Sequence, residues 1–285
     1  QWLVPYLAKS LYKCFGTVQP QPVTIGGETL SYDGRYLPNL SPTGLKAILS
    51  GPTGLPKTLQ GLRDDSLNKL NALFKENRAQ TTAERAFLDQ MVNSQQQLRN
   101  LIDQVATDLQ GINGNDAANQ VLTAVLLVKM NVTPAVTIHL PFSGDNHVDV
   151  GWKSESAQTV ASVANINLMM QKLKAYNLQD KVTFATMNVF GRELGGVEGR
   201  GHNPVHAVSV IIGKGIKGGV IGGLVPGGRS ADINSATGAA SAGADVPATE
   251  SLPALAKTLG VAVGLTQAQV DDQITSGKVV RAALV

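Results

Sequence analysis

The stretch Pro134-Ala135-Val136-Thr137-Ile138-His139-Leu140 decides the fold class of this 285-residue chain. It is short, apolar and rich in β-branched residues, which is typical of a buried strand. Helices are predicted before it, over Asp116–Met130, and after it, over Ser154–Asn177. Further strands are predicted at Lys181–Asn188 and Val205–Ile212. Because strands that alternate with helices of this length indicate βαβ crossovers, we predict an α/β fold with a mostly parallel sheet.

The first half of the chain has a different pattern. Val23–Leu30 places two extended runs around a Gly-Gly pair, which predicts a β-hairpin. A Pro/Gly-rich connector follows over Pro38–Pro56, and helical periodicity is clearest from Ser66 to Gln110. We therefore expect residues 1–115 to form an N-terminal hairpin and helical region. Residues 116–285 are expected to form the α/β portion that carries the site, within one continuous domain.

The helical region carries an apolar stripe at spacings of three, four and seven residues. Its members are Leu67, Leu70, Phe74, Phe87, Met91, Leu98, Ile102, Val105 and Leu109. The segment Thr81-Thr82-Ala83-Glu84 predicts a capping box at the start of the second helix. We interpret the stripe as the core-facing side of a helix pair rather than as a coiled-coil surface, because the pattern lasts for too few heptads.

The last part of the chain predicts less regular structure. Pro226–Glu250 is rich in Gly, Ala and Ser, which indicates a long surface loop. Helices are expected at Ser251–Gly260 and Thr266–Ile274, and a final edge strand at Lys278–Val285.

Composition excludes several classes of function. Charged residues make up 16% of the chain, the net charge is +3, and no dense Lys/Arg block is present. Aromatic residues make up 5%, so neither an electrostatic nor a stacking surface for nucleic acid is indicated. Cys14 is the only cysteine, which rules out an internal disulfide. No apolar run reaches the roughly 18 residues of a transmembrane segment.

Polar residues gather just after the predicted strands, where ligands bind in open α/β sheets. The segment Asp145-Asn146-His147-Val148-Asp149 is the first of these. In an extended chain Asp145, His147 and Asp149 point to one side, so they form a candidate site for a divalent ion. A polar turn explains the same residues equally well, because Asp-Asn pairs favour such turns.

The next polar segments contain Arg192, His202 and His206. Arg192 follows a predicted strand and is placed to hold an anion or to pair with Asp145 or Glu193. His202 and His206 are four residues apart, as zinc ligands on a helix often are. Pro204 and the β-branched residues after it favour a strand start instead, where a histidine is usually a satisfied structural group.

The segment Gly213-Lys214-Gly215-Ile216-Lys217-Gly218 matches the dinucleotide-binding pattern. That mechanism requires a helix to begin there, so that its N-terminus meets the pyrophosphate. The chain continues Gly219-Val220-Ile221-Gly222-Gly223, which does not favour a helix, and we expect a glycine-rich turn. No Ser lies in a Gly-x-Ser-x-Gly nucleophile elbow, so no nucleophile is assigned.

Four segments, taken in order, resemble domain-of-unknown-function family 1501, a group of exported, sulfatase-like relatives of the alkaline phosphatase superfamily. They are Asp145-Asn146-His147, Asn188-Val189-Phe190-Gly191-Arg192, Gly199-Arg200-Gly201-His202 and Gly213-Lys214-Gly215-Ile216-Lys217-Gly218-Gly219. The resemblance runs from about Tyr32 to the C-terminus. It implies an alkaline-phosphatase-like, three-layer α/β/α sandwich. It also implies a periplasmic location and a twin-arginine leader that is removed from or absent in this chain.

In that superfamily, carboxylate and histidine ligands at strand ends hold two divalent ions, which activate Ser or Thr against phosphate or sulfate esters. The resemblance therefore implies Asp145, His147 and His202 as metal ligands, with Asp149 or His206 as substitutes. The ion implied is zinc, manganese, calcium or magnesium. Arg192 is implied as the group that binds the anion.

Departures from the family pattern bear on activity. Gly201 stands where the family has an aspartate before its histidine, and Val189 replaces a glutamate. The superfamily's first strand, with its metal ligand and nucleophile, has no match here. Since carboxylates neutralise the bound ion, losing one weakens a metal site strongly.

The expected function is that of a periplasmic, sulfatase-like protein with a degenerate metal site. Its role would be structural or the binding of a small anionic ligand, as a subunit of a larger protein complex, and no catalytic residue is assigned. The alternative is an active metal-dependent hydrolase of phosphate or sulfate esters.

Overall fold

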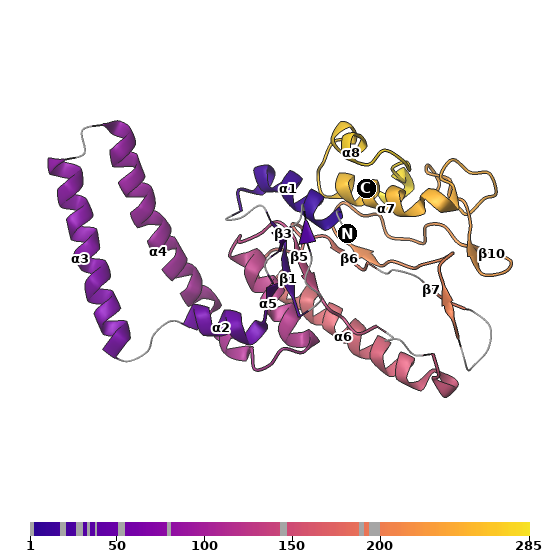
Figure 1. The fold of residues 1–285 in the computed structure, drawn as a ribbon, viewed down its shortest axis with the longest axis horizontal. Coiled ribbons are helices and arrows are strands. Elements are labelled where there is room, and N and C mark those ends of the chain that lie inside the picture. The colour runs from indigo at the N-terminus through magenta and orange to yellow at the C-terminus, as the bar shows by residue number, and fades with distance from the viewer. Residues whose placement is uncertain are drawn as a thin grey trace.

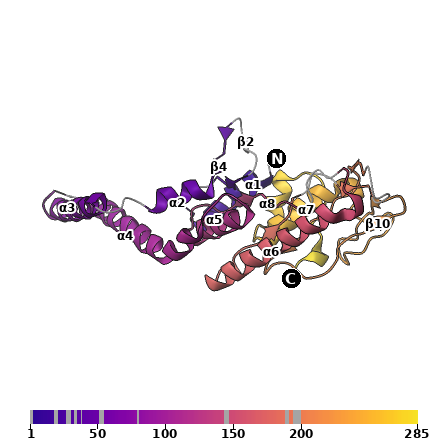
Figure 2. The ribbon, with the colours of Figure 1, turned by 90° about the horizontal axis from the view of Figure 1, so that it is seen from below.

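The structure is a computed structural model. It describes residues 3–17, 21–26, 31–32, 35–37, 39–50, 55–78, 81–142, 147–187, 191–193 and 200–285. The fold is mixed α/β, with 52% helix, a small parallel sheet packed against helices, and small antiparallel hairpins. Figure 1 shows a projecting pair of helices, α3 (Leu55–Asn77) and α4 (Thr82–Gly111), beside a central part and a C-terminal part. Figure 2 shows that this helix pair extends from one end of the molecule.

The parallel sheet is centred on strand β1 (Val23–Ile25). It lies between β4 (Asn39–Leu40) and β5 (Val136–Ile138) and is parallel to both. The predicted hairpin partner of β1 is therefore wrong, because parallel neighbours occupy both edges of β1; residues 27–30, the second run of the predicted hairpin, lie outside the described residues. All three β1 side chains are buried, as expected of a strand covered on both faces.

Helices α5 (Ala117–Lys129) and α6 (Lys153–Ala175) confirm two predictions from periodicity. The Asp116 side chain caps α5 by accepting a hydrogen bond from the Asn119 backbone N–H at 3.1 Å. α5 packs against β1, β5 and α6. The main hydrophobic core joins the N-terminal region to α5 and includes Val23, Ile25, Leu45, Val105, Leu109, Ile112, Leu126 and Leu127.

The predicted connector Pro38–Pro56 contains β4 and a helix, α2 (Pro42–Ser50). Ser41 caps this helix by accepting a hydrogen bond from the Gly44 backbone N–H at 3.1 Å. A capping Ser followed by Pro is a start signal for a helix, because Pro fits the first helical position without losing a hydrogen bond. The Pro and Gly content of the segment favoured a connector, although Ser41-Pro42 is a local signal for the start of a helix.

The predicted capping box at Thr81 and Glu84 is confirmed at the start of α4. The far end of α4 is buried in the core through Val105 and Leu109. The core-facing interpretation is wrong at the other end of the helix pair, where Leu70, Phe74 and Phe87 are 60%, 51% and 66% exposed. This end extends away from the body, so no core lies within its reach (Figure 1).

The second half of the chain forms short antiparallel pairs. They are β6 (Phe184–Ala185) with β9 (Ile211–Ile212), β7 (Gly191–Arg192) with β8 (His202–Asn203), and β10 (Leu224–Val225) with β11 (Arg229–Ser230). In the first half, β2 (Ser31–Tyr32) pairs with β3 (Arg35–Tyr36). Helix α1 (Leu3–Phe15) packs near α7 (Ser251–Ala262) and α8 (Gln267–Gln273). Short helical turns occur at Val150–Trp152, Ala248–Glu250 and Arg281–Ala283.

Both the C-terminal strand and the glycine-rich turn at Gly213–Gly218 are predictions from sequence. The predicted strand Lys278–Val285 is wrong, because Leu284 makes a single bridge to Ile216 beside the turn Arg281–Ala283. Residues 213–218 are all described, and no helix begins among them. They form a turn and a single β-bridge. This excludes a dinucleotide loop there. None of the described helices has the length and apolar character needed to cross a membrane.

We predict that Asp108→Ala destabilises the junction between α4 and α6. The Asp108 carboxylate accepts hydrogen bonds from Lys172 Nζ, at 2.5 Å, and from the Tyr176 hydroxyl. Burial opposes ionisation, but these two bonds outweigh it and lower the pKa of Asp108. Loss of the carboxylate is expected to reduce the free energy of unfolding by about 1–3 kcal/mol at neutral pH.

Urea denaturation measures this loss. Asp89→Ala is the control, because its pair with Lys75 is exposed and is expected to contribute less than about 1 kcal/mol. Since the pKa of Asp108 is lowered on folding, its contribution is present above about pH 4 and is lost as the pH falls through the lowered value. Equal losses in the two variants at neutral pH would contradict the prediction.

Candidate functional site

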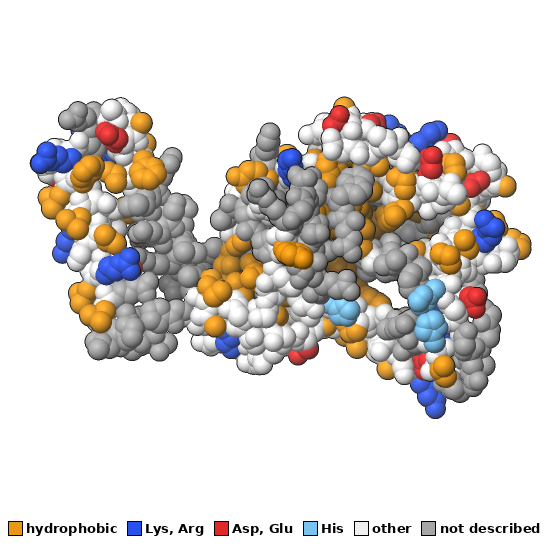
Figure 3. Space-filling view, viewed as in Figure 1, with side chains coloured by type: hydrophobic (Ala, Val, Ile, Leu, Met, Phe, Trp, Pro, Cys, Tyr) orange, Lys and Arg blue, Asp and Glu red, His pale blue; other side chains and the backbone are white. Residues whose placement is uncertain are grey.

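Three of the sequence-predicted residues meet at the β7–β8 pair. Arg192 lies directly opposite His202 in this antiparallel pair, so their side chains share one face. His147 reaches the same place from the segment before α6. Its ring centroid lies 4.8 Å from that of His202, and its Nε2 lies 3.5 Å from Nη1 of Arg192. Figure 3 shows histidine side chains gathered at the end of the molecule where Figure 1 places β7.

Asp149 has a structural task beside this cluster. Its carboxylate accepts hydrogen bonds from the backbone N–H groups of Ser154, at 3.1 Å, and Glu155, at 2.8 Å. Gly151 and Trp152 adopt left-handed φ angles of +69° and +62°, which turn the chain so that this carboxylate caps α6. The bonds from Glu155 and Ser154 lower the pKa of Asp149, so it is charged at neutral pH. Both carboxylate oxygens therefore bind the helix start.

Arg200 is a site-building residue that sequence reasoning missed. Its side chain is 2% exposed and forms an ion pair with Glu155, and its guanidinium lies 3.8 Å from the ring centroid of Trp152. These contacts join the segment before β8 to the start of α6, which places His202 beside His147. No local sequence pattern predicts these contacts, because the partners of Arg200 lie more than forty positions away along the chain.

His206 lies on the other face of β7. Its Nδ1 donates a hydrogen bond to the Gly228 carbonyl oxygen at 2.7 Å, and the side chain is buried. A Cβ atom on Gly191 would lie 2.3 Å from the His206 ring. Because neighbouring residues of a strand point to opposite faces, His206 is separated from the face that holds Arg192.

Glu193 brings a carboxylate next to Gly201. Its Oε2 accepts a hydrogen bond from the Gly201 backbone N–H at 3.2 Å, and a Cβ atom on Gly201 would lie 3.1–3.3 Å from the carboxylate. An acidic group therefore lies next to position 201, but Glu193 supplies it instead of an aspartate at position 201 itself. Asp145, the remaining predicted ligand, lies outside the described residues.

The described cluster is rich in hydrogen-bond donors and cations. Two imidazoles and a guanidinium on one face suit an oxyanion, because all three groups are able to donate hydrogen bonds to it. Within the described ranges, no three His, Cys, Asp or Glu side chains are grouped to hold a metal ion. Two imidazoles alone would supply half of a tetrahedral ligand set.

Comparisons of this chain with protein-family models, with curated proteins and with solved structures found no match.

We predict that Gly191→Ala destabilises the fold, because the added methyl group would overlap the His206 ring. Overpacking of this kind costs about 1–3 kcal/mol, which thermal or urea unfolding measures. His206→Ala removes the ring but leaves the His206 carbonyl oxygen, which would lie 2.8 Å from the added methyl group, so it relieves the overlap in part. The cost of Gly191→Ala is therefore expected to shrink when both substitutions are present, and an additive double-mutant cycle would sink the explanation.

Proposed function

We propose that this protein binds a small oxyanion, of the phosphate or sulfate type, at the cluster of His147, Arg192 and His202. The observation that carries the proposal is the contact of Arg192 with His147 on the face that also presents His202. A guanidinium at a strand end beside an imidazole offers planar, charged donors that suit a tetrahedral anion. The proposed role is binding rather than catalysis, at a degenerate metal site.

The tasks of the neighbouring residues support a degenerate site. Asp149 caps α6 with both carboxylate oxygens, and His206 donates to the Gly228 carbonyl on the other face of β7. Neither side chain is directed at His147 and His202. A metal ion would therefore need ligands in addition to His147 and His202. An anion would need only the donors of the cluster itself.

We further propose that the chain has an alkaline-phosphatase-like, three-layer α/β/α architecture. An apolar cavity of about 920 Å³ supports this arrangement. Residues of α1 and α7, including Leu7 and Leu259, line it together with residues of α5 and α6, including Val125 and Met169. Consecutive residues of the β5 and β6 segments, 133–138 and 180–187, also line it. Since the side chains of a strand alternate between its faces, consecutive lining residues indicate that the cavity runs along strand edges, which is compatible with strands between two layers of helices.

An exported, periplasmic location and membership of a larger protein complex belong to the same proposal. They rest on the motif resemblance to the sulfatase-like family.

The alternative proposal is a metal-dependent hydrolase of phosphate or sulfate esters. The observation that favours it is the 4.8 Å separation of the His147 and His202 rings, which brings two imidazoles near one point. With Asp145 as a third ligand and Arg192 on the anion, a zinc, manganese, calcium or magnesium ion would activate water or polarise the ester.

We predict that metal-free protein binds phosphate or sulfate in isothermal titration calorimetry. Arg192→Ala is expected to weaken binding by about ten- to a hundredfold, because a hydrogen bond to a charged group contributes about 1.5–3 kcal/mol. Arg281→Ala is the matched control, since Arg281 is an exposed arginine in the C-terminal turn. Binding that is equally strong in all three proteins would overturn the assignment of Arg192.

Elemental analysis of protein purified without chelator separates the two proposals. Under the binding proposal, we expect far less than one metal ion per chain. Near-stoichiometric metal that is lost in Asp145→Ala and His202→Ala, but kept in His139→Ala, would establish the hydrolase instead and would justify an ester-substrate screen. His139 is a suitable control because it is exposed and lies on the β5 side of the molecule.

A further inference from the structure

Helix α3 presents its apolar side outward and its polar side to α4. Four leucines, Leu59, Leu62, Leu70 and Leu73, are each 56–60% exposed. Together with Ser66 they lie within about 80° of the helix circumference, at 3.6 residues per turn. Figure 3 shows orange side chains along the outer edge of the projecting helices. A helix normally turns such a stripe toward its packing partner.

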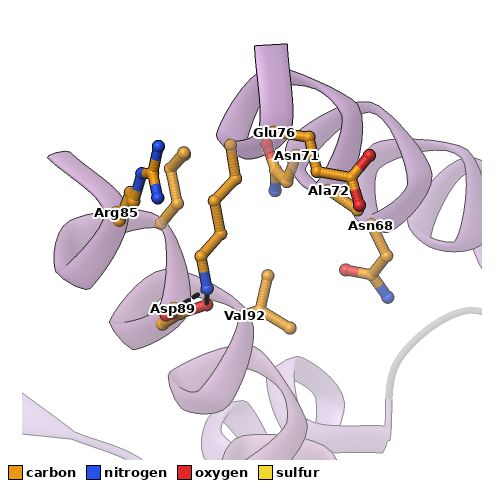
Figure 4. A pocket seen from close by; sticks show the side chains of 9 residues that line it. Asn68, Asn71, Ala72, Glu76, Arg85, Asp89 and Val92 are labelled. Carbon is orange, nitrogen blue, oxygen red and sulfur yellow. Dashed lines mark hydrogen bonds and ion pairs between the residues drawn. The ribbon is translucent and has the colours of Figure 1, made fainter. Parts of the chain in front are cut away.

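The opposite side of α3 packs against α4 and is polar. Asp64, Asn68, Asn71 and Lys75 are half-buried there. Figure 4 shows Asn68 and Asn71 on α3 facing Arg85, Asp89 and Val92 on α4. Lys75 Nζ donates to Asp89 Oδ1 at 2.7 Å across this interface. The polar contact fixes which side of α3 remains outward, and that side is the leucine stripe.

The leucine stripe has a palindromic spacing about Ser66. Leu62 and Leu70 lie four residues from Ser66 on either side, and Leu59 and Leu73 lie seven residues away. An antiparallel second copy of α3, related by a two-fold axis at Ser66, would therefore place Leu59 against Leu73 and Leu62 against Leu70. A two-fold interface requires this kind of self-complementary pattern.

Charge and size agree with the same axis. Asp65 and Lys69 are exposed on one edge of the leucine stripe. In the antiparallel arrangement each Asp65 meets Lys69 of the second copy, twice across the axis. Ser66 is small, and its hydroxyl donates to the Leu62 carbonyl oxygen of its own helix at 2.8 Å, so the two helices are able to approach closely at the centre. The body of the molecule lies on the α4 side of α3, so a second copy has room on the outer side (Figures 1 and 2).

We propose that the leucine stripe of α3 is the interface of a two-fold symmetric homodimer, in which α3 packs antiparallel against α3 of a second copy of this chain. The α3–α4 pairs of the two copies then form a four-helix arrangement. It buries the leucines that the isolated hairpin leaves exposed.

Sedimentation or light scattering of the full chain tests the proposal. Wild-type protein is expected to be a dimer at micromolar concentration. The double variant Leu62→Glu, Leu70→Glu is expected to raise the dissociation constant by at least about a hundredfold. Because both leucines are exposed, circular dichroism should show an unchanged fold. A wild-type protein that stays monomeric at high micromolar concentration overturns the proposal, and so does a double variant that remains dimeric.

Charge exchange tests the register of the two helices. Asp65→Lys alone and Lys69→Asp alone each bring like charges together and are expected to weaken the dimer. The double variant Asp65→Lys, Lys69→Asp restores opposite charges and is expected to recover the wild-type association. Failure of the double variant to recover association would overturn this antiparallel register.

Cross-linking tests the axis itself. In a Cys14→Ser background, Ser66→Cys places two thiols at the two-fold axis, and oxidation with copper–phenanthroline is expected to give a covalent dimer. Asn68→Cys, on the side toward α4, is the control and should remain uncross-linked. Cross-linking of Asn68→Cys in preference to Ser66→Cys would show a different interface and would overturn the proposal.

Discussion

The fold depends on the burial of β1 between two parallel neighbours. Val23, Thr24 and Ile25 are 2%, 1% and 0% exposed, and their backbone pairs with β4 on one side and with β5 on the other. β5 lies more than a hundred residues along the chain, so this one strand joins the N-terminal region to the part of the chain that begins at residue 116. The core leucines of α2, α4 and α5 pack around it. α5 packs against β1 and β5 on one side and against α6 on the other, so the position of α6 depends on this sheet.

The site depends in turn on how the start of α6 is held. Asp149, which precedes α6, accepts hydrogen bonds from its first backbone N–H groups. Arg200, which comes later in the chain, pairs through its buried guanidinium with Glu155 in the same turn. Two left-handed residues, Gly151 and Trp152, make this turn tight enough for both contacts. A left-handed Trp is strained, and its ring stacks on Arg200, which offsets part of that cost. The exposed histidines of the cluster are thus placed by residues that are themselves buried.

Local signals predicted the helices well, and non-local pairing explains what they missed. Asp116 and Thr81 announce α5 and α4 because a cap bonds to residues within the next turn. The partners of β1 are not local, so the Gly-Gly pair after it favoured a neighbouring run as its partner, where β1 pairs with β4 and β5 instead. For the site, strand-end position was enough to single out His147 and His202. Strand-end position did not distinguish Asp149, which caps α6, from the residues of the cluster. It also gave no indication of Arg200.

The apolar pattern of α3 shows where periodicity alone misleads. A leucine stripe predicts that one side of a helix is buried, but it leaves open what covers that side. Here the polar contacts between Lys75 and Asp89, and around Asn68 and Asn71, orient the helix pair within the chain. Surface ion pairs of this kind contribute little to stability, and on the α4 side the half-buried Leu88 and Val92 add apolar contact to the interface. Helix stability in proteins comes mainly from burial of the apolar side, and in α3 that side faces away from its own chain. In the proposed dimer a second copy covers the leucine stripe, which adds apolar burial to a helix pair that each copy already forms.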